Sequence, residues 1–212
     1  MKSIVSLISG RGSNFEAIVK MAQKEAWPAH FAGVIANHPQ AKGLDFAREV
    51  GIPTFIIDHR DFVSRETFDA ALIAKIEELK PNLVVLAGFM RILTAGFIHQ
   101  YEGRLVNIHP SLLPHFAGLH THQRALEAGA HKHGATVHFV TTGVDEGPII
   151  CQAELTVLAG ENEAQLAARV LRLEHQIYPR AVKWFIDDRL RIEGNKVKLS
   201  PPETQFFASG SL

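Results

Sequence analysis

Five short apolar runs, separated by segments with helical spacing, constrain the fold of this 212-residue chain more than any other feature. The runs are SIVSLIS at 3–9, FAGVIA at 31–36, IPTFII at 52–57, NLVVLAG at 82–88 and RLVNIHP at 104–110. They are apolar almost throughout, which is typical of strands covered on both faces of a parallel sheet. The pattern predicts an α/β fold with an open, doubly wound, mostly parallel sheet and helices on both faces.

The segments between the runs carry helix signals. One helix is predicted after the candidate N-cap Ser64, and Pro81 ends its pattern. Its apolar residues are Phe68, Leu72, Ile76 and Leu79. A longer helix is predicted from Glu163 to about Asp187, and Pro179 is expected to bend or interrupt it. Its buried stripe is predicted at Leu166, Val170, Leu173 and Ile177.

The pattern changes after residue 134. The segment ATVHFVTTGVDEGPIICQAELTV contains two extended runs joined by a glycine-containing loop, which predicts an antiparallel or mixed extension of the sheet. RIEGNKVKL predicts a hairpin that turns at Gly194 and Asn195, whereas the tail SPPETQFFASGSL carries little signal. Neither a repeat nor a linker divides the chain, so we expect a single domain.

Charge and cysteine content exclude several classes of protein. Lys plus Arg and Asp plus Glu are both 22, and the basic residues form no dense cluster, so we expect a small substrate and no nucleic acid. The single cysteine, Cys151, cannot form an intramolecular disulfide. The N-terminal apolar run is too short for a secretory signal, and no segment approaches the roughly 18 apolar residues of a membrane span. We therefore expect a cytoplasmic protein without a membrane partner.

The loop in ISGRGSNFEAIV follows the first predicted strand and opens a helix, a position that offers backbone N–H groups to an anion. Gly10 and Gly12 allow close approach of a ligand, and Ser13 and Asn14 add side-chain donors. The dinucleotide fingerprint is incomplete because Phe15 occupies its third glycine position. The loop therefore favours a single phosphate over a dinucleotide. A tight turn that merely requires glycine is the alternative.

Asn107 and His109 interrupt the last apolar run. Residues two apart on a strand share a face, and Pro110 then takes the chain out at the carboxyl edge, where ligands bind in such folds. An amide can donate to a developing oxyanion, and a protonated imidazole can donate or transfer a proton. The alternative is a buried pair whose polar groups are satisfied by neighbouring backbone.

A nearby carboxylate would favour the cationic form of His109. Asp145, in TTGVDEGPII, is the best candidate, with Glu146 as a substitute. Asp145 could instead cap its own turn. The pairs His120-x-His122 and His131-x-His133 suggest a metal site only weakly, because no clustered cysteines or H-E-x-x-H helix accompany them, so we predict no catalytic metal.

Six segments carry a family resemblance: SGRGSN, VVLAGFMRIL, NIHPSLLP, GLHTHQRALEAG, VHFVTTGVDEGPII and EHQIYP. From residue 3 to about residue 192 the chain resembles the phosphoribosylglycinamide formyltransferases, a family of the folate-dependent formyltransferase superfamily. The superfamily shares the Asn, His and Asp set, whereas the loop GRGSN and the EH pair favour the glycinamide ribonucleotide branch. The resemblance implies one formyltransferase domain over 1–212, with 1–100 mainly binding the nucleotide phosphate and 101–190 mainly catalytic and folate-binding.

The resemblance also implies a reaction. The amine of glycinamide ribonucleotide would attack the formyl carbon of the co-substrate 10-formyltetrahydrofolate, in de novo purine biosynthesis. Asn107 and His109 would hold the oxyanion, and Asp145 would keep His109 charged and help to move protons. Gly12, Ser13 and Asn14 would hold the phosphate, and Glu174 would meet the ribose or glycinamide end. The implied folate-binding residues are Arg65, Met90, Arg91, Ile92, Leu93, Asn107, Thr141, Val144 and Asp145.

Two positions depart from the family pattern. Leu171 stands where polar residues are common near the phosphate, and Ala117 replaces a proline often seen in the loop after SLLP. These departures concern phosphate contacts and loop rigidity rather than the chemistry. We expect a monomer or a homodimer.

Four other functions remain as alternatives. A formyltetrahydrofolate hydrolase would use the same three residues with water as the acceptor, and a methionyl-tRNA formyltransferase would transfer to an RNA-bound amine. We do not expect the hydrolase, because such enzymes usually carry an additional amino-terminal regulatory domain and this chain starts directly at its first strand. We do not expect the methionyl-tRNA formyltransferase, because the chain lacks the length and basic surface of an added RNA-binding domain. A non-catalytic nucleotide sensor would not need the complete Asn, His and Asp set. A metal-dependent hydrolase would lose activity on treatment with EDTA.

Overall fold

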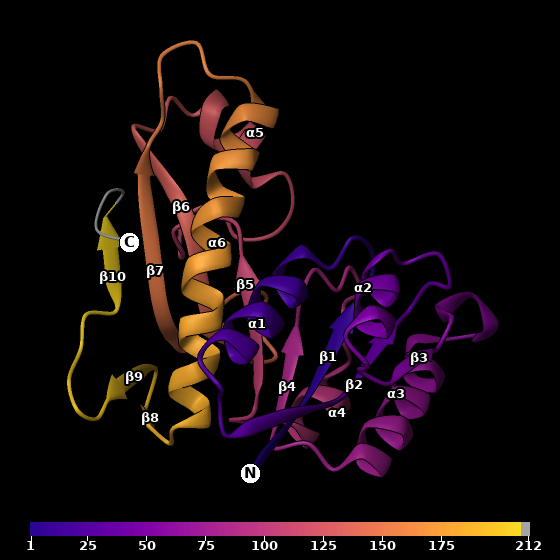
Figure 1. Ribbon diagram of the computed structural model, residues 1–212. Coiled ribbons are helices and arrows are strands. Elements are labelled where there is room, and N and C mark those ends of the chain that lie inside the picture. The colour runs from indigo at the N-terminus through magenta and orange to yellow at the C-terminus, as the bar shows by residue number, and fades with distance from the viewer. Residues whose placement is uncertain (209–212) are drawn as a thin grey trace. The chain divides into compact units, whose positions relative to one another are not determined.

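The computed structural model describes residues 1–208 of the chain. The chain forms two compact units, Met1–Asn107 and Ile108–Leu212, which we call the first unit and the second unit (Figure 1). The single domain over 1–212 stays a prediction. Residues 209–212, which end the tail of weak sequence signal, lie outside the described residues.

Strands and helices alternate in the first unit. Its strands are β1 (Lys2–Ile8), β2 (Ala29–Ala36), β3 (Thr54–Ile56), β4 (Leu83–Leu86) and β5 (Leu105–His109), and the last two residues of β5 belong to the second unit. Its helices are α1 (Ser13–Lys24), α2 (Gly43–Glu49), the short 3-10 helix η1 (His59–Asp61), α3 (Arg65–Leu79) and α4 (Ala95–Gln100). All five apolar runs form strands, as predicted.

The strand order of the first unit creates a natural ligand site. The order is β3-β2-β1-β4-β5, and every neighbouring pair is parallel. The chain builds outward from β1 to β3 and then resumes on the other side of β1 with β4. Ligands bind in open α/β sheets at such a reversal, outside the carboxyl ends of the strands. Ser3–Ile8 of β1 and all of β4 are buried, as predicted for covered parallel strands, whereas β3, at the end of the strand order, has no buried residue.

Helix α3 begins and ends where the sequence indicates. Ser64 Oγ accepts a hydrogen bond from the Thr67 N–H at 3.2 Å, and Thr67 Oγ1 accepts one from the Ser64 N–H at 3.3 Å. This reciprocal capping satisfies N–H groups that the first helical turn leaves open. The helix ends at Lys80, which is left-handed, directly before Pro81. Its buried residues include Phe68, Leu72 and Ile76.

The second unit is a mixed sheet with one long helix. Strands β6 (Lys132–Phe139) and β7 (Ile149–Thr156) are antiparallel, and α6 (Glu163–Ile186) packs on both. Strands β8 (Leu190–Glu193) and β9 (Lys196–Leu199) form the predicted hairpin, and β9 pairs with β7. Two elements were not predicted, α5 (Thr121–Glu127) and β10 (Phe206–Ala208), which pairs with β7 in parallel. Together the two units confirm an α/β fold with mostly parallel strands.

Helix α6 does not stop at Pro179 but continues through it as one element of 24 residues. Proline removes one backbone hydrogen bond from a helix interior, a cost of about 3 kcal/mol. The buried face extends across both sides of this position, from Leu173 and Ile177 to Val182 and Trp184. Burial of such side chains contributes about 1.5–3 kcal/mol each, which outweighs the lost bond.

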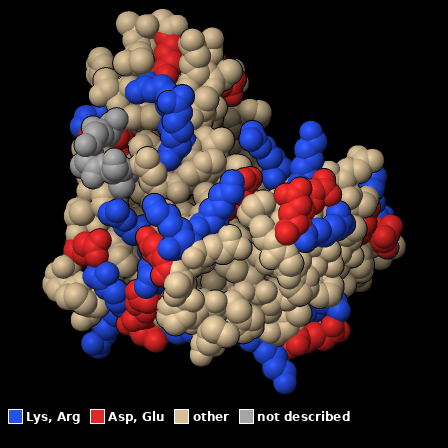
Figure 2. Space-filling view, viewed as in Figure 1, with Lys and Arg blue, Asp and Glu red and all other residues tan. Residues whose placement is uncertain are grey.

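The surface carries charges of both signs. On the face shown in Figure 2, basic and acidic residues are interspersed rather than gathered into a field of one sign. Among residues 1–208, no helix is both long enough and apolar enough to cross a membrane.

Candidate active site

The loop between β1 and α1 leaves the start of a helix open to a ligand. Gly12 is the N-cap of α1 and has a left-handed φ of 70°, which favours glycine. A Cβ atom at this position would also lie 3.1 Å from the Cα of Gly43. No side chain caps this helix, in contrast to α3. The start of α1 therefore has no capping side chain from its N-cap residue, at the point where the helix dipole favours an anion.

A cavity of about 290 Å³ lies in front of this helix start. It is lined by residues 9–14 and by Ala87, Gly88 and Met90, which follow β4. The loops after β1 and β4 therefore enclose the cavity where the strand order reverses. All three predicted phosphate residues, Gly12, Ser13 and Asn14, line it.

The segment 88–94, which contains four of the predicted folate-binding residues, is held at both ends by side chains. Ser9 Oγ accepts a hydrogen bond from the Met90 N–H, and Asp69 Oδ2 accepts one from the Thr94 N–H, each at 2.7 Å. Between these points Met90 is 70% exposed and Ile92 68% exposed. The segment thus presents two large, exposed apolar side chains.

The other predicted folate-binding residues of this segment differ in exposure. Arg91 is partly exposed, whereas Leu93 is buried. Arg65 is the exposed first residue of α3, one turn before Asp69, so it projects from the same face of the helix as the residue that holds Thr94.

His109 and Asp145 form an ion-pair geometry in the second unit. His109 Nδ1 lies 3.3 Å from Asp145 Oδ2, and their side chains are 8% and 14% exposed. The Gly118 N–H also donates to Asp145 Oδ2, at 2.9 Å. Asp145 has a left-handed φ of 56°, a conformation that Asp and Asn adopt more readily than most residues. The structure brings together the imidazole and the carboxylate that the sequence selected, whereas Glu146 is exposed.

Both ring nitrogens of His109 face oxygen atoms. His109 Nε2 lies 3.0 Å from the carbonyl oxygen of Phe116. Only a cationic imidazole carries two N–H donors, so this is the form that could donate to Phe116 and Asp145 together. The Arg124 guanidinium donates to the carbonyl oxygen of Ala117 at 2.7 Å and thereby stabilises the loop that carries Phe116 and Gly118.

A second histidine lies on the other side of Asp145. His138 Nε2 is 3.8 Å from Asp145 Oδ1, and His138 Nδ1 is 2.9 Å from the carbonyl oxygen of Phe139. Burial lowers the pKa of His138 below its ordinary value. The carboxylate of Asp145 is therefore held between His109 and a histidine whose charged form is disfavoured.

Asn107 lies two residues before His109 on β5, in the first unit, where it is paired with Leu86 of β4. Its side chain is partly exposed. Thr141 and Val144 lie in the loop after β6, and Val144 is 63% exposed.

Glu174, which the family resemblance implies as a nucleotide-binding residue, is buried. It lies on α6 and is only 7% exposed. Position 174 follows Val170 by four residues and precedes Ile177 by three, so helical spacing places this carboxylate beside the buried stripe of α6.

The remaining histidine motifs are explained by a contact between neutral rings. His122 Nδ1 lies 3.1 Å from His133 Nε2, and the ring of Phe116 packs edge-on against His133. Burial lowers the pKa of His122 and lowers that of His133 to about 4. Within residues 1–208, no three or more His, Cys, Asp or Glu side chains form a group that could hold a metal ion.

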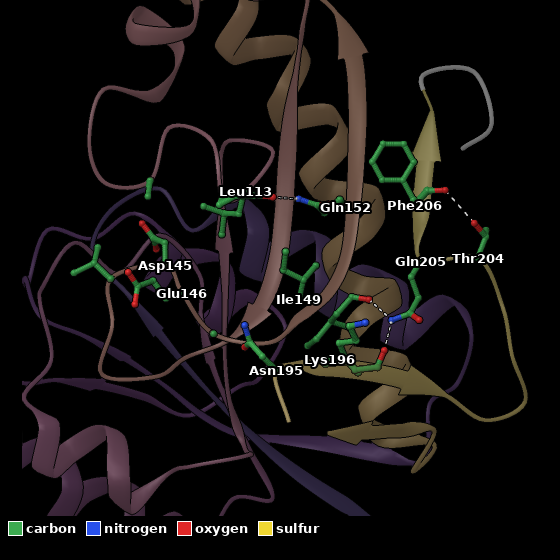
Figure 3. A pocket seen from close by; sticks show the side chains of 16 residues that line it. Leu113, Asp145, Glu146, Ile149, Gln152, Asn195, Lys196, Thr204, Gln205 and Phe206 are labelled. Atoms are coloured by element: carbon green, nitrogen blue, oxygen red, sulfur yellow. Dashed lines mark hydrogen bonds between the residues drawn. The ribbon is translucent and has the colours of Figure 1, made fainter. Parts of the chain in front are cut away.

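A larger cavity of about 940 Å³ lies next to Asp145 (Figure 3). In this view Asp145 and Glu146 lie on one side of it and Phe206 on the other, with Leu113, Ile149 and Gln152 between them. Gln152 Nε2 donates to the carbonyl oxygen of Leu113 at 2.9 Å. The sequence did not indicate this cavity, because residues 204–206 line it and belong to the tail of weak signal.

Comparisons with known proteins identify the family to which this chain is similar. The family model described as formyl transferase matches residues 2–182. The phosphoribosylglycinamide formyltransferase of Escherichia coli is 47% identical over 95% of this chain and 97% of its own length.

Two solved structures of formyltransferases are also similar to this chain. The structure of the phosphoribosylglycinamide formyltransferase of Coxiella burnetii, which covers 98% of both chains at 45% identity, has a TM-score of 0.90. Glycinamide ribonucleotide transformylase 1 of Symbiobacterium toebii covers 94% of both chains at 44% identity, with a TM-score of 0.91. On the family match and these relatives, the chain belongs to the formyl transferase family.

Proposed function

We propose that this chain transfers the formyl group of 10-formyltetrahydrofolate to the primary amine of glycinamide ribonucleotide, a step of de novo purine biosynthesis. The observation that carries the proposal is the 3.3 Å approach of His109 Nδ1 to Asp145 Oδ2 in a largely buried setting. The names of the relatives, together with the identity over nearly their whole length, support these two substrates.

The reaction proceeds by addition and elimination. The amine nitrogen attacks the formyl carbon, and the C=O electron pair moves onto oxygen. The bond between this carbon and N10 of the folate then breaks, while one proton leaves the amine and one reaches N10. The products are the formylated ribonucleotide and tetrahydrofolate, so atoms and charge balance without an added reactant.

Asn107 and His109 are the groups proposed to stabilise the oxyanion. The Asn107 amide and the N–H at His109 Nε2 donate to the same oxygen. Loss of one such donor typically costs about 3–4 kcal/mol of transition-state stabilisation. Because His109 Nε2 is bonded to the Phe116 carbonyl in this structure, it must exchange that oxygen for the formyl oxygen.

Asp145 is proposed to favour the cationic form of His109. Its carboxylate faces Nδ1, so the protonated ring directs its other N–H, at Nε2, toward substrate. The same carboxylate assists proton movement from the amine to N10, either directly or through water.

Substrate binding is assigned to the residues that the family resemblance implies. Gly12, Ser13 and Asn14 bind the phosphate, and Glu174 binds the ribose or glycinamide end. The folate contacts Arg65, the segment from Met90 to Leu93, Asn107, Thr141, Val144 and Asp145. Holding both substrates in one orientation supplies a further part of the rate enhancement.

Three features of the proposal concern partners and setting. The reaction uses no metal, so treatment with EDTA is expected to leave turnover unchanged. The chain acts as a monomer or a homodimer. A cytoplasmic location, with neither nucleic acid nor membrane as a partner, stays the expectation from the sequence.

The test is an assay of tetrahydrofolate release from 10-formyltetrahydrofolate, with and without glycinamide ribonucleotide. Release that requires the ribonucleotide is the expected result. Release at the same rate without the ribonucleotide would instead identify a hydrolase with water as the acceptor.

A further inference from the structure

The cavity between the loops after β1 and β4 is lined almost entirely by neutral residues. Nine residues line it, and Arg11 is the only one of them that carries a charge. Arg11 stands between Gly10 and Gly12, in the loop that leads to the uncapped start of α1. The only formal charge at this cavity is therefore positive and lies beside backbone donors that favour an anion.

The guanidinium of Arg11 is not used by the fold. Within residues 1–208, Arg11 has no ion pair, side-chain hydrogen bond or aromatic stacking partner. Two other exposed arginines of the first unit, Arg48 and Arg60, are paired with carboxylates. Arg48 is 2.9 Å from Asp45, and Arg60 pairs with Asp58 through two nitrogens.

A phosphate monoester supplies the negative charge and the acceptor oxygens that complement this arrangement of donors. At neutral pH it carries close to two negative charges, and the planar guanidinium fork donates two parallel hydrogen bonds to its oxygens. Backbone N–H groups and the hydroxyl of Ser13 bind such oxygens but supply no formal charge. Arg11 can supply the charge that distinguishes a phosphate from a neutral hydroxyl group.

We propose that Arg11 is a specificity-determining residue that binds the phosphate of the acceptor and makes the enzyme prefer the ribonucleotide over the corresponding riboside. The inference rests on the proposed function, because that function supplies the phosphorylated acceptor. The inference goes beyond the proposed function by assigning the selection for phosphate to one side chain outside the Gly12, Ser13 and Asn14 set.

The test compares two acceptors, glycinamide ribonucleotide and the riboside that lacks its phosphate, in the parent, in Arg11→Ala and in Arg11→Lys. Arg11→Ala is expected to raise the KM for the ribonucleotide roughly 10- to 100-fold, the range of a charge-assisted hydrogen bond. The KM for the riboside and the kcat for both acceptors are expected to stay near the parent values. Arg11→Lys keeps the charge but not the paired donors, so an intermediate KM is expected.

The matched control is Arg48→Ala, which removes an exposed arginine of the same unit that lines no part of this cavity. This variant should keep the parent KM for both acceptors. An Arg11→Ala variant with an unchanged ratio of ribonucleotide to riboside KM would overturn the inference. An equal rise in KM for both acceptors would do the same, since it would indicate damage to the loop rather than loss of a phosphate contact.

A binding measurement separates this inference from the proposed function. Ribose 5-phosphate is titrated into the parent and Arg11→Ala by calorimetry, with no folate present. Weaker binding in Arg11→Ala supports the role of Arg11 even if the parent fails to transfer formyl groups, and equal binding overturns it. Failure of the proposed function would appear in the parent enzyme alone, as turnover that does not depend on the ribonucleotide.

Discussion

Asp145 is the residue on which the proposed chemistry depends most. Its carboxylate accepts the Gly118 N–H and faces both His109 and His138. Asparagine keeps the size of this side chain and also tolerates a left-handed φ, so Asp145→Asn removes the charge with little effect on folding. We expect kcat to fall by roughly 10³- to 10⁴-fold, as for a misoriented or uncharged catalytic histidine.

Stopped-flow or steady-state assays of formyl transfer measure this effect, and calorimetric titration of the ribonucleotide should show nearly parent affinity. Glu146→Gln is the matched control, because Glu146 neighbours Asp145 but is exposed. Parent turnover in Asp145→Asn would show that the assigned role is wrong.

The His122–His133 pair predicts a pH dependence of stability. Burial lowers the pKa of His133 from 6.5 to about 4, so the unfolded chain takes up a proton at a pH at which the folded chain does not. The stability is therefore fully present above pH 6.5 and is lost as pH falls toward 4, by up to about 3 kcal/mol. Urea unfolding at a series of pH values between 4 and 7 measures it.

His133→Gln removes this titration, so the variant should lose less unfolding free energy than the parent over the same pH range. Equal losses in the two proteins would refute the assignment to His133.

Single residues were partly predictable from the sequence. The spacing of Asn107 and His109 indicates a polar strand end, and the sequence around Asp145 predicts it as the carboxylate partner. The contact between His122 and His133 was not predictable from local pattern, because it depends on the packing of a helix against a strand.

At the scale of elements, the geometry of the segment 88–94 determines how its residues are positioned for the proposed folate binding. Ser9 lines the smaller cavity and also holds the Met90 N–H, so one hydroxyl connects the proposed phosphate site to the proposed folate segment. Ser9→Ala removes this bond, which contributes about 1 kcal/mol. We expect a higher KM for 10-formyltetrahydrofolate by several-fold, measured at saturating ribonucleotide.

Ser6→Ala serves as the control, because Ser6 lies on β1, the strand that precedes Ser9, is fully buried and does not line the cavity. An unchanged folate KM in Ser9→Ala would show that Ser9 does not position the segment.

Helix capping offers a stability test at the same scale. Ser64 and Thr67 cap α3 reciprocally, and replacing a capping serine with alanine costs about 1 kcal/mol. Ser64→Ala should lower the unfolding free energy by that amount, as measured with urea. Ser64→Asp keeps a capping oxygen and should restore most of the loss. Equal stability of the parent and Ser64→Ala would contradict this account of the helix start.

Elements with strong periodicity were predictable, and elements defined by their neighbours were not. The five apolar runs became strands, and the continuous apolar sequence of β1 and β4 matches their burial. Strand β10 is only three residues long and exists through its pairing with β7, so its own residues carry little signal. Pro179 was expected to bend or interrupt α6, yet the helix is not interrupted and has buried residues on both sides of the proline.

At the scale of the whole molecule, the strand order explains the position of the cavity that we propose as the phosphate site. Alternation of strands and helices places the loops after β1 and β4 at the reversal of the sheet, and the glycine loop lies there. The sequence predicted this position from the order of elements alone. It could not predict the larger cavity beside Asp145, which several distant segments enclose.

The most direct test follows the formyl group itself. The enzyme is incubated with 10-formyltetrahydrofolate labelled in the formyl carbon together with glycinamide ribonucleotide, and the label is traced by mass spectrometry. We predict that label appears in the ribonucleotide in equal amount to the tetrahydrofolate released, and that Asp145→Asn abolishes most of this transfer. Label recovered as free formate, or transfer unaffected by Asp145→Asn, would contradict the account.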